Sequence, residues 1–157
     1  MGNFGICRVD LMKGLPYHYD IDTPIENGVL AEVDYATGKI KATTDVTKKQ
    51  VLVASVANLY NSLDESDFRN EVGAIKPRTY EFEKGNFFTT TQIAFGADRA
   101  NIGAVVKGDY AYATVGGKLT VASTFPSTGS IPVQKFRVEE KTQLNGKDAL
   151  VLKVELA

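Results

Sequence analysis

The sequence predicts an all-β protein, an antiparallel barrel or sandwich, on the basis of three observations. Short segments rich in β-branched and aromatic residues recur along the chain, and a glycine-containing turn closes each of them. No long helical stretch alternates with these segments, which argues against a parallel α/β sheet. The chain has 157 residues, of which 43% are hydrophobic and 24% charged, values typical of one globular domain. We therefore expect a single β-rich domain over residues 1–157.

Nine strands are expected between the turns. The turn motifs are Asn27-Gly28, Thr37-Gly38-Lys39, Lys84-Gly85-Asn86, Gly108-Asp109, Gly116-Gly117-Lys118 and Asn145-Gly146. The expected strands are Val29 to Asp34, Lys39 to Thr43, Val51 to Tyr60, Arg78 to Glu83, Phe87 to Ala94, Asp109 to Val115, Lys118 to Ala122, Ile131 to Lys141 and Ala149 to Leu156. The third of these is ambiguous between helix and strand, and its β-branched content favours a strand.

Two further segments complete the expected architecture. Between residues 62 and 72, apolar side chains recur loosely at helical spacing after acidic capping groups, which predicts one or two helical turns. Residues 1–23 contain Gly2, Gly5, Gly14 and Pro16, so the sequence allows an extended N-terminal arm there that orders on binding.

Charge and hydropathy exclude several function classes. The 18 basic and 19 acidic residues give a net charge of −1, which does not suggest binding to nucleic acid or to an anionic membrane. The N-terminus meets charges at Arg8 and Asp10 before any long apolar core, so we expect no secretory signal. No apolar run approaches the roughly 20 residues that a membrane helix needs.

The residue types that carry chemistry are scarce. The single cysteine, Cys7, excludes an intrachain disulfide framework, and with the single histidine, His18, it excludes the usual zinc constellations. A dinucleotide fingerprint, a phosphate-binding loop and a serine-hydrolase elbow are all absent from the sequence. We therefore expect no catalytic, cofactor-binding or metal-binding residue, no cofactor, and a protein that is not an enzyme.

Some acidic and aromatic residues are open to both a functional and a structural interpretation. Asp20, Asp22 and Glu26 resemble calcium ligands, but without the EF-hand spacing a turn explains them better. Two carboxylate pairs are expected on solvated strand faces: Glu81 with Glu83, and Glu139 with Glu140. Tyr110 and Tyr112 share a strand face, where they form either a contact surface or, as we favour, cross-strand packing.

The C-terminal hairpin carries a definite register prediction. A two-residue loop at Asn145-Gly146 would place charged side chains beside the apolar row of the returning strand. A three-residue loop instead pairs Val138 with Leu152 and Phe136 with Val154. We therefore predict the three-residue loop.

The order of these pieces resembles a known family. The succession runs Glu26-Asn27-Gly28-Val29-Leu30, Thr37-Gly38-Lys39, the strand from Val51 to Tyr60, Arg78, Gly85-Asn86-Phe87-Phe88-Thr89-Thr90, Gly108-Asp109-Tyr110-Ala111 and Gly116-Gly117-Lys118-Leu119. It resembles the small virion structural proteins of tailed bacteriophages, of the accessory head or capsid-decoration type, over most of the chain from about residue 26.

This resemblance implies a non-enzymatic protein that binds and reinforces a capsid lattice. Its expected partners are the major capsid protein or neighbouring copies of itself, as a homo-oligomer, and its expected location is the virion after synthesis in the host cytoplasm. Many modest contacts can then hold together, because neighbouring copies raise each other's effective concentration. The alternative is a carbohydrate- or receptor-binding β-module of a tail or fibre, which would need an exposed aromatic cluster with polar partners.

Overall fold

The computed structural model describes residues 3–10, 12–15, 18–56, 65–96 and 98–157. The described residues form thirteen strands: β1 (Cys7–Asp10), β2 (Lys13–Leu15), β3 (Asp20–Ile21), β4 (Leu30–Asp34), β5 (Lys39–Ala42), β6 (Gln50–Val53), β7 (Thr79–Glu81), β8 (Phe87–Thr90), β9 (Ile93–Phe95), β10 (Tyr110–Ala113), β11 (Leu119–Ala122), β12 (Lys135–Leu144) and β13 (Lys147–Leu156). Two short 3₁₀ helices accompany them, η1 (Glu65–Asp67) and η2 (Ile102–Ala104). The all-β class expected from the sequence is confirmed.

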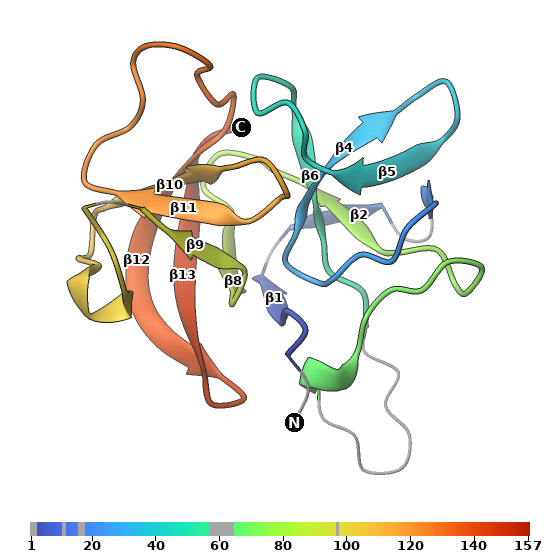
Figure 1. Ribbon diagram of the computed structural model, residues 1–157, viewed down its shortest axis with the longest axis horizontal. Helices are drawn as coiled ribbons and strands as arrows, with labels where there is room; N and C mark the ends of the chain where they lie inside the picture. Colours follow the sequence, from blue (N-terminus) through green and yellow to red (C-terminus); the bar gives the residue numbers. More distant parts are fainter. Residues whose placement is uncertain (1–2, 11, 16–17, 57–64, 97) are drawn as a thin grey trace.

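Two curled sheets make up the body. The seven-stranded sheet has the order β1-β8-β13-β12-β10-β11-β9, and the six-stranded sheet has the order β2-β7-β6-β4-β5-β3. Figure 1 shows the first sheet on the left with the long β12–β13 hairpin, the second on the right, and β1 between them. All strand pairs in the described residues are antiparallel except β9 with β11 and β3 with β5. No helix in the described residues is long and apolar enough to cross a membrane.

The segment that contains β8 and β9 is bent, and its two halves pair near opposite ends of the seven-stranded sheet. The sequence predicts a single strand from Phe87 to Ala94, but the structure divides it at Thr91 and Gln92. Before the bend β8 pairs with β13 and β1, whereas after it β9 pairs with β11 at the far edge. At the bend, Gln92 N donates to Thr90 Oγ1 at 3.0 Å. Because the same short segment reaches both ends, the sheet must curl.

The main core lies between the sheets and contains a cluster of three phenylalanines. Phe82 follows β7 of the six-stranded sheet, whereas Phe88 and Phe136 belong to β8 and β12 of the other. The ring centroids are 4.9 to 5.4 Å apart in tilted and edge-to-face pairs. Such pairs contribute about 1 kcal/mol each beyond the burial of apolar area. The cluster therefore joins the two sheets.

The six-stranded sheet buries apolar side chains on both of its faces. Along β6, Leu52 contributes to the main core, whereas Val51 and Val53 contribute to a second cluster with Ile25 and Ile40. All four residues of β6 are buried. This two-sided burial is why the sequence shows an uninterrupted apolar run there instead of alternation.

Two expectations for the middle of the chain are confirmed in part. Of the strand expected from Val51 to Tyr60, Val51 to Val53 belong to β6, residues 54–56 belong to no strand, and residues 57–60 lie outside the described residues. The short helix expected between residues 62 and 72 is present as the single turn η1, and residues 62–64 lie outside the described residues.

The N-terminal stretch, for which the sequence allows an extended arm over residues 1–23, pairs with the body at three places. All four residues of β1 pair with β8, β2 pairs with β7, and β3 pairs in parallel with β5. Ile6 is only 2% exposed, and Gly5 N donates to Glu26 Oε1 at 2.8 Å. The described residues of this stretch therefore form edge strands of the two sheets and not a free arm.

The loop of the β12–β13 hairpin differs from the expectation. Leu144 pairs with Lys147, so the loop has two residues and the three-residue prediction is wrong. Asn145 and Gly146 both have positive φ, 53° and 76°. Two positive φ values are what a type I′ turn requires, and its twist matches that of the paired strands.

A β-bulge at Glu139 restores the register expected in the core. The ladder shifts by one residue between Val138 and Glu140, which leaves Glu139 as the extra residue of β12. Val138 therefore pairs with Leu152 as expected, and the expected pairing of Phe136 with Val154 is also present. The turn residues decide the register at the tip, the apolar pattern decides it in the core, and the bulge absorbs the difference.

The two sheets also touch through their backbones. Leu30 N on β4 donates to the carbonyl of Gly117, in the turn between β10 and β11, at 2.9 Å. A Cβ atom on Gly117 would lie 2.4 Å from Val29 Cγ1 and 2.5 Å from Leu30 O. The φ of Gly117 is +85°, which is unfavourable for other residues. Glycine is therefore the residue that fits this crossing.

We expect Gly117→Ala to destabilise the protein far more than Gly116→Ala. Gly116 has a φ of +100° but open space around its Cα, so alanine there costs only the left-handed conformation, about 1 kcal/mol. Gly117→Ala bears the same cost plus about 2 kcal/mol for displacing packed backbone. Urea unfolding of both variants measures the difference, and equal losses would contradict this account of the crossing.

Candidate interaction surface

The cysteine and the histidine belong to different sheets. Cys7 lies on β1, at the edge of the seven-stranded sheet. His18 precedes β3 of the six-stranded sheet, is exposed, and contacts the Tyr19 ring edge-on with centroids 4.8 Å apart. The structure therefore places them in separate packing environments and does not assemble them into one site.

The acidic residues near the N-terminus each have their own structural partner. Asp20 Oδ1 accepts a hydrogen bond from Ile21 N at 2.8 Å. Asp22 Oδ1 forms an ion pair with Lys39 Nζ at 2.7 Å. Glu26 Oε1 accepts a hydrogen bond from Gly5 N, just before β1. Asp22 and Glu26 thus tie this stretch to β5 and to the segment before β1.

The first carboxylate pair lies on a solvated face, as expected. Glu81 and Glu83 are exposed, whereas the alternating residues Tyr80 and Phe82 are 8% and 7% exposed and belong to the main core. The alternation follows from the period of two along a strand.

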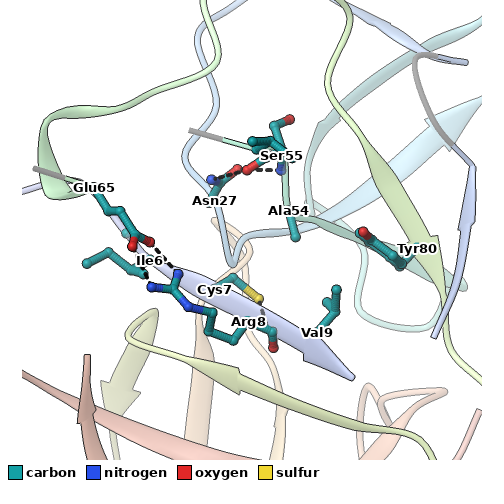
Figure 2. A pocket seen from close by; sticks show the side chains of 11 residues that line it. Ile6, Cys7, Arg8, Val9, Asn27, Ala54, Ser55, Glu65 and Tyr80 are labelled. Atoms are coloured by element: carbon teal, nitrogen blue, oxygen red, sulfur yellow. Dashed lines mark hydrogen bonds and ion pairs between the residues drawn. The ribbon is translucent and has the colours of Figure 1, made fainter. Parts of the chain in front are cut away.

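A cavity of about 380 Å³ opens between β1 and the six-stranded sheet. Figure 2 shows β1 along one side of it and the segment after β6 on the other. Its lining residues are Gly5, Ile6, Cys7, Arg8, Val9, Asn27, Ala54, Ser55, Val56, Glu65 and Tyr80.

The polar groups around this cavity are engaged with one another. Asn27 Nδ2 donates to Ser55 O and Ser55 N donates to Asn27 Oδ1, both at 2.9 Å. Both terminal nitrogens of Arg8 donate to the Glu65 carboxylate. Burial raises the pKa of the Cys7 thiol to about 12, so the thiol stays protonated at neutral pH and is a poor nucleophile. The described residues that line the cavity therefore include no activated nucleophile.

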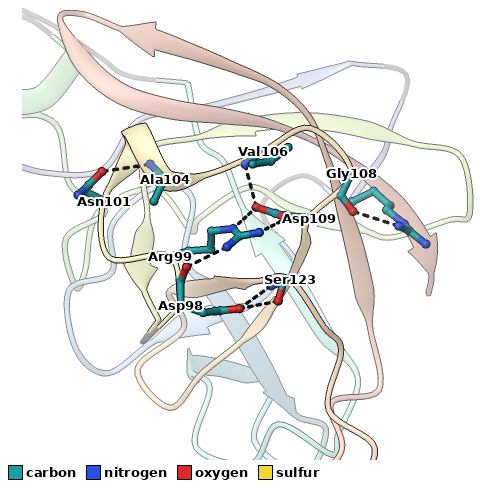
Figure 3. A network of polar contacts seen from close by, with 9 residues as sticks. Asp98, Arg99, Asn101, Ala104, Val106, Gly108, Asp109 and Ser123 are labelled. Atoms are coloured by element: carbon teal, nitrogen blue, oxygen red, sulfur yellow. Dashed lines mark hydrogen bonds and ion pairs between the residues drawn. The ribbon is translucent and has the colours of Figure 1, made fainter.

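An ion-pair network holds the loop between β9 and β10 (Figure 3). Arg99 donates to both carboxylate oxygens of Asp109, at 2.6 and 3.0 Å, and Val106 N donates to the same carboxylate at 2.8 Å. Asp98 accepts from the backbone N and the hydroxyl of Ser123 at 3.1 and 2.6 Å. Asp109 directly precedes β10, so the network fixes the start of that strand.

The outer face of the seven-stranded sheet carries a row of aromatic and cationic side chains across four strands. In the ladder register Tyr110 on β10 is opposite Arg137 on β12, which is opposite Lys153 on β13, which is opposite Phe87 on β8. Arg137 Cζ lies 4.1 Å from the Tyr110 ring centroid, and Lys153 Nζ lies 5.7 Å from that of Phe87. We call these four residues the cation–aromatic row.

Strand β10 shows why the tyrosines face outward. Ala111 and Ala113 are 0% and 3% exposed and belong to the main core, so the residues that alternate with them point away from it. The prediction that Tyr110 and Tyr112 share a face is confirmed, and both pack against Phe125, with centroids 6.2 and 5.6 Å away. The tyrosines are half-buried, so they serve both cross-strand packing and the surface.

Arg137 is the most constrained member of the row. Its Nη2 donates to Tyr110 Oη at 2.8 Å, and its Nη1 donates to Gly108 O at 3.0 Å. Its Nε donates to the Glu155 carboxylate at 3.2 Å, and the guanidinium holds the pKa of Glu155 below its usual value. Lys135 Nζ lies 3.7 Å from the same carboxylate. These contacts fix the guanidinium over the tyrosine ring.

A groove of about 620 Å³ runs beside the row. It is lined by Lys84, Gly85, Arg137, Glu139, Lys153, Val154 and Glu155. The bulge separates the second carboxylate pair, because Glu139 lines the groove while Glu140 is exposed outside it. The sequence predicts the polar face of β12 but not the groove, because only the pairing of β12 with β13 brings Lys153 opposite Arg137.

We expect Asp109→Asn to destabilise the protein by about 2 kcal/mol at pH 7, because a buried charge-assisted hydrogen-bond network is lost. Arg99 and the Val106 amide hold the pKa of Asp109 below its usual value in the folded protein. Its contribution is therefore present above the unfolded pKa of about 4 and is lost as the pH falls through the folded value.

The measurement is urea unfolding of both proteins from pH 7 to pH 3. The difference between wild type and Asp109→Asn should narrow as the pH falls. Glu140→Gln removes an exposed carboxylate and serves as the control that stays close to wild type throughout. A wild-type advantage that is the same at every pH would contradict this assignment.

We expect Cys7 to react slowly with a thiol reagent in the folded protein. At pH 8 the raised pKa leaves almost none of it as thiolate, and thiolate is the reacting form. Absorbance assay with a disulfide reagent should therefore show a much faster reaction in denaturing urea. Equal rates in the folded and unfolded protein would show that the thiol is not desolvated.

Comparison with known proteins yields no relative: no family model matches the chain, no curated protein matches its sequence, and no solved structure matches its fold.

Proposed function

We propose that this protein is a non-enzymatic structural protein of a tailed-phage particle, located in the virion, where it binds the capsid lattice and reinforces it as a head-decoration or accessory protein. The observation that carries the proposal is the cation–aromatic row on the outer face of the seven-stranded sheet. Together with the order of turn motifs from about residue 26, it supports a protein that acts through a contact surface.

The row has the composition of a protein interface. Tyrosine, phenylalanine and arginine are enriched at such interfaces, and they supply most of the energetically important contacts. Arg137 is already held by Tyr110, Gly108 and Glu155, so binding would cost little further side-chain entropy. A rigid surface of this kind suits repeated attachment to a lattice.

The partners of this proposal are the major capsid protein and neighbouring copies of the chain in a homo-oligomeric array. Contacts between neighbouring copies would raise the effective concentration at each site, so modest individual affinities suffice. At a net charge of −1 the protein cannot depend on long-range attraction, and buried contact area has to supply the binding energy.

The alternative is a carbohydrate- or receptor-binding module of a tail or fibre. A sugar ring would need an open aromatic face on which to stack. The Tyr110 ring already lies beneath Arg137 and the Phe87 ring beneath Lys153, so a cation shares each of them. The geometry of the row therefore favours a protein partner.

The test is co-sedimentation of the purified protein with purified phage capsids that lack it, alongside binding to a glycan array. We expect saturable sedimentation with capsids, weakened only modestly when salt is raised from low to physiological concentration, because few net charges are involved. Retention on a defined glycan without capsid binding would overturn the proposal in favour of the alternative.

A further inference from the structure

Two lysines of the groove, one of them the Lys153 of the cation–aromatic row, have no carboxylate partner among the described residues. Lys135 and Arg137 share the Glu155 carboxylate at 3.7 and 3.1 Å. In the part of the chain that the structure describes, neither Lys84 nor Lys153 forms an ion pair, although both are exposed and both line the groove. The groove lining thus carries three cations against the carboxylates of Glu139 and Glu155, a net charge of +1, in a chain whose net charge is −1, and Lys84 and Lys153 are its cations without an ion pair among the described residues.

We infer that this groove binds an acidic segment of the partner protein, in which carboxylates meet Lys84 and Lys153 and an apolar side chain reaches beyond the groove to the part of half-buried Phe87 that Lys153 leaves uncovered. The inference rests on the proposed function, because it names the chemistry of the capsid surface that the row contacts. Lys153 lies over the Phe87 ring and marks the point where the charged and apolar contacts of such a segment would meet.

The arrangement of charges selects a protein segment over nucleic acid. Glu139 and Glu155 line the same groove as the lysines. Nucleic acid carries closely spaced phosphates, so any strand laid along the groove would place phosphates against these carboxylates. A protein segment with separated carboxylates can meet Lys84 and Lys153 while avoiding both glutamates. Its polypeptide backbone is neutral, so it adds no repulsion.

We expect the two lysines to make a modest contribution to the binding free energy. Exposed ion pairs contribute little individually, but pairs that lose water on binding contribute more. We expect loss of both lysines to weaken binding about tenfold, which corresponds to about 1.4 kcal/mol. Because only two charges take part, binding should decrease gently with salt and should not collapse.

The experiment uses the full chain and a fluorescent synthetic peptide in which glutamate alternates with leucine, read out by fluorescence anisotropy. The test variant combines Lys84→Gln with Lys153→Gln, and Phe87→Ser is assayed separately for the apolar contact. The matched control is Lys49→Gln, which removes an exposed lysine in the loop before β6, on the other sheet. Thermal unfolding checks that every variant is folded.

We expect the peptide to bind wild type and Lys49→Gln equally and the double variant about tenfold more weakly, while the same peptide with lysine in place of glutamate does not bind. Binding that is equal for wild type and the double variant would overturn the inference. Preferential binding of an acidic polysaccharide such as hyaluronate would also overturn it, as would wild-type self-association that the double variant abolishes, because the occupant would then be a second copy.

A parallel co-sedimentation of the same variants with capsids separates the two ideas. Capsid binding that is undiminished in the double variant would refute the groove as the contact and leave the proposed function standing. Selective peptide binding without any capsid binding would support the chemistry of the groove and refute the proposed function. Loss of both peptide and capsid binding in the double variant supports both.

Discussion

The two sheets approach each other closely at positions where only glycine fits. A Cβ on Gly117 would collide with Leu30 O, one on Gly28 would lie 2.5 Å from Thr90 Oγ1, and one on Gly5 would lie 2.4 Å from Asn27 O. These three crossings tie the turn between β10 and β11, the approach to β4, and the approach to β1 to the opposite sheet. The packing of the phenylalanine cluster between the sheets and the position of β1 both depend on how closely the two sheets approach each other at these glycines.

The packing of the core also determines which side chains form the candidate interaction surface on the outer face of the seven-stranded sheet. Each core residue of β10, β12, β13 and β8 fixes the direction of its strand neighbours, because side chains alternate between the two faces. Phe88, Phe136 and Leu152 point inward at 0 to 1% exposure, so Phe87, Arg137 and Lys153 must point outward. Core packing thus determines which residues of the cation–aromatic row face outward. The hydrogen bonds of Asp109 fix the residue at which β10 begins.

Local patterns in the sequence predict strands in the regions of β4 to β13, because burial on one or two faces produces a recognisable apolar pattern, but they miss β1, β2 and β3, where an extended arm is expected. They do not reveal departures from regular pairing. The division of Phe87 to Ala94 into β8 and β9 depends on closing a curled sheet, and the bulge at Glu139 reconciles a turn and a core that disagree by one residue. The groove depends on the pairing of β12 with β13, which brings Lys153 opposite Arg137. Nothing within one strand encodes that meeting.

The position of β13 in the seven-stranded sheet has a consequence for how the protein is made. β1 pairs with β8, and β8 in turn pairs with β13, which is synthesised after every other strand of that sheet. At about 5–20 residues per second, ribosomal synthesis separates the emergence of β1 from that of β13 by roughly 10 to 30 seconds. During that interval the edges of β8 and β12 that β13 later joins are unpaired, so the sheet assembles largely after translation of β13 and these two edges are open to pairing with other nascent chains until then.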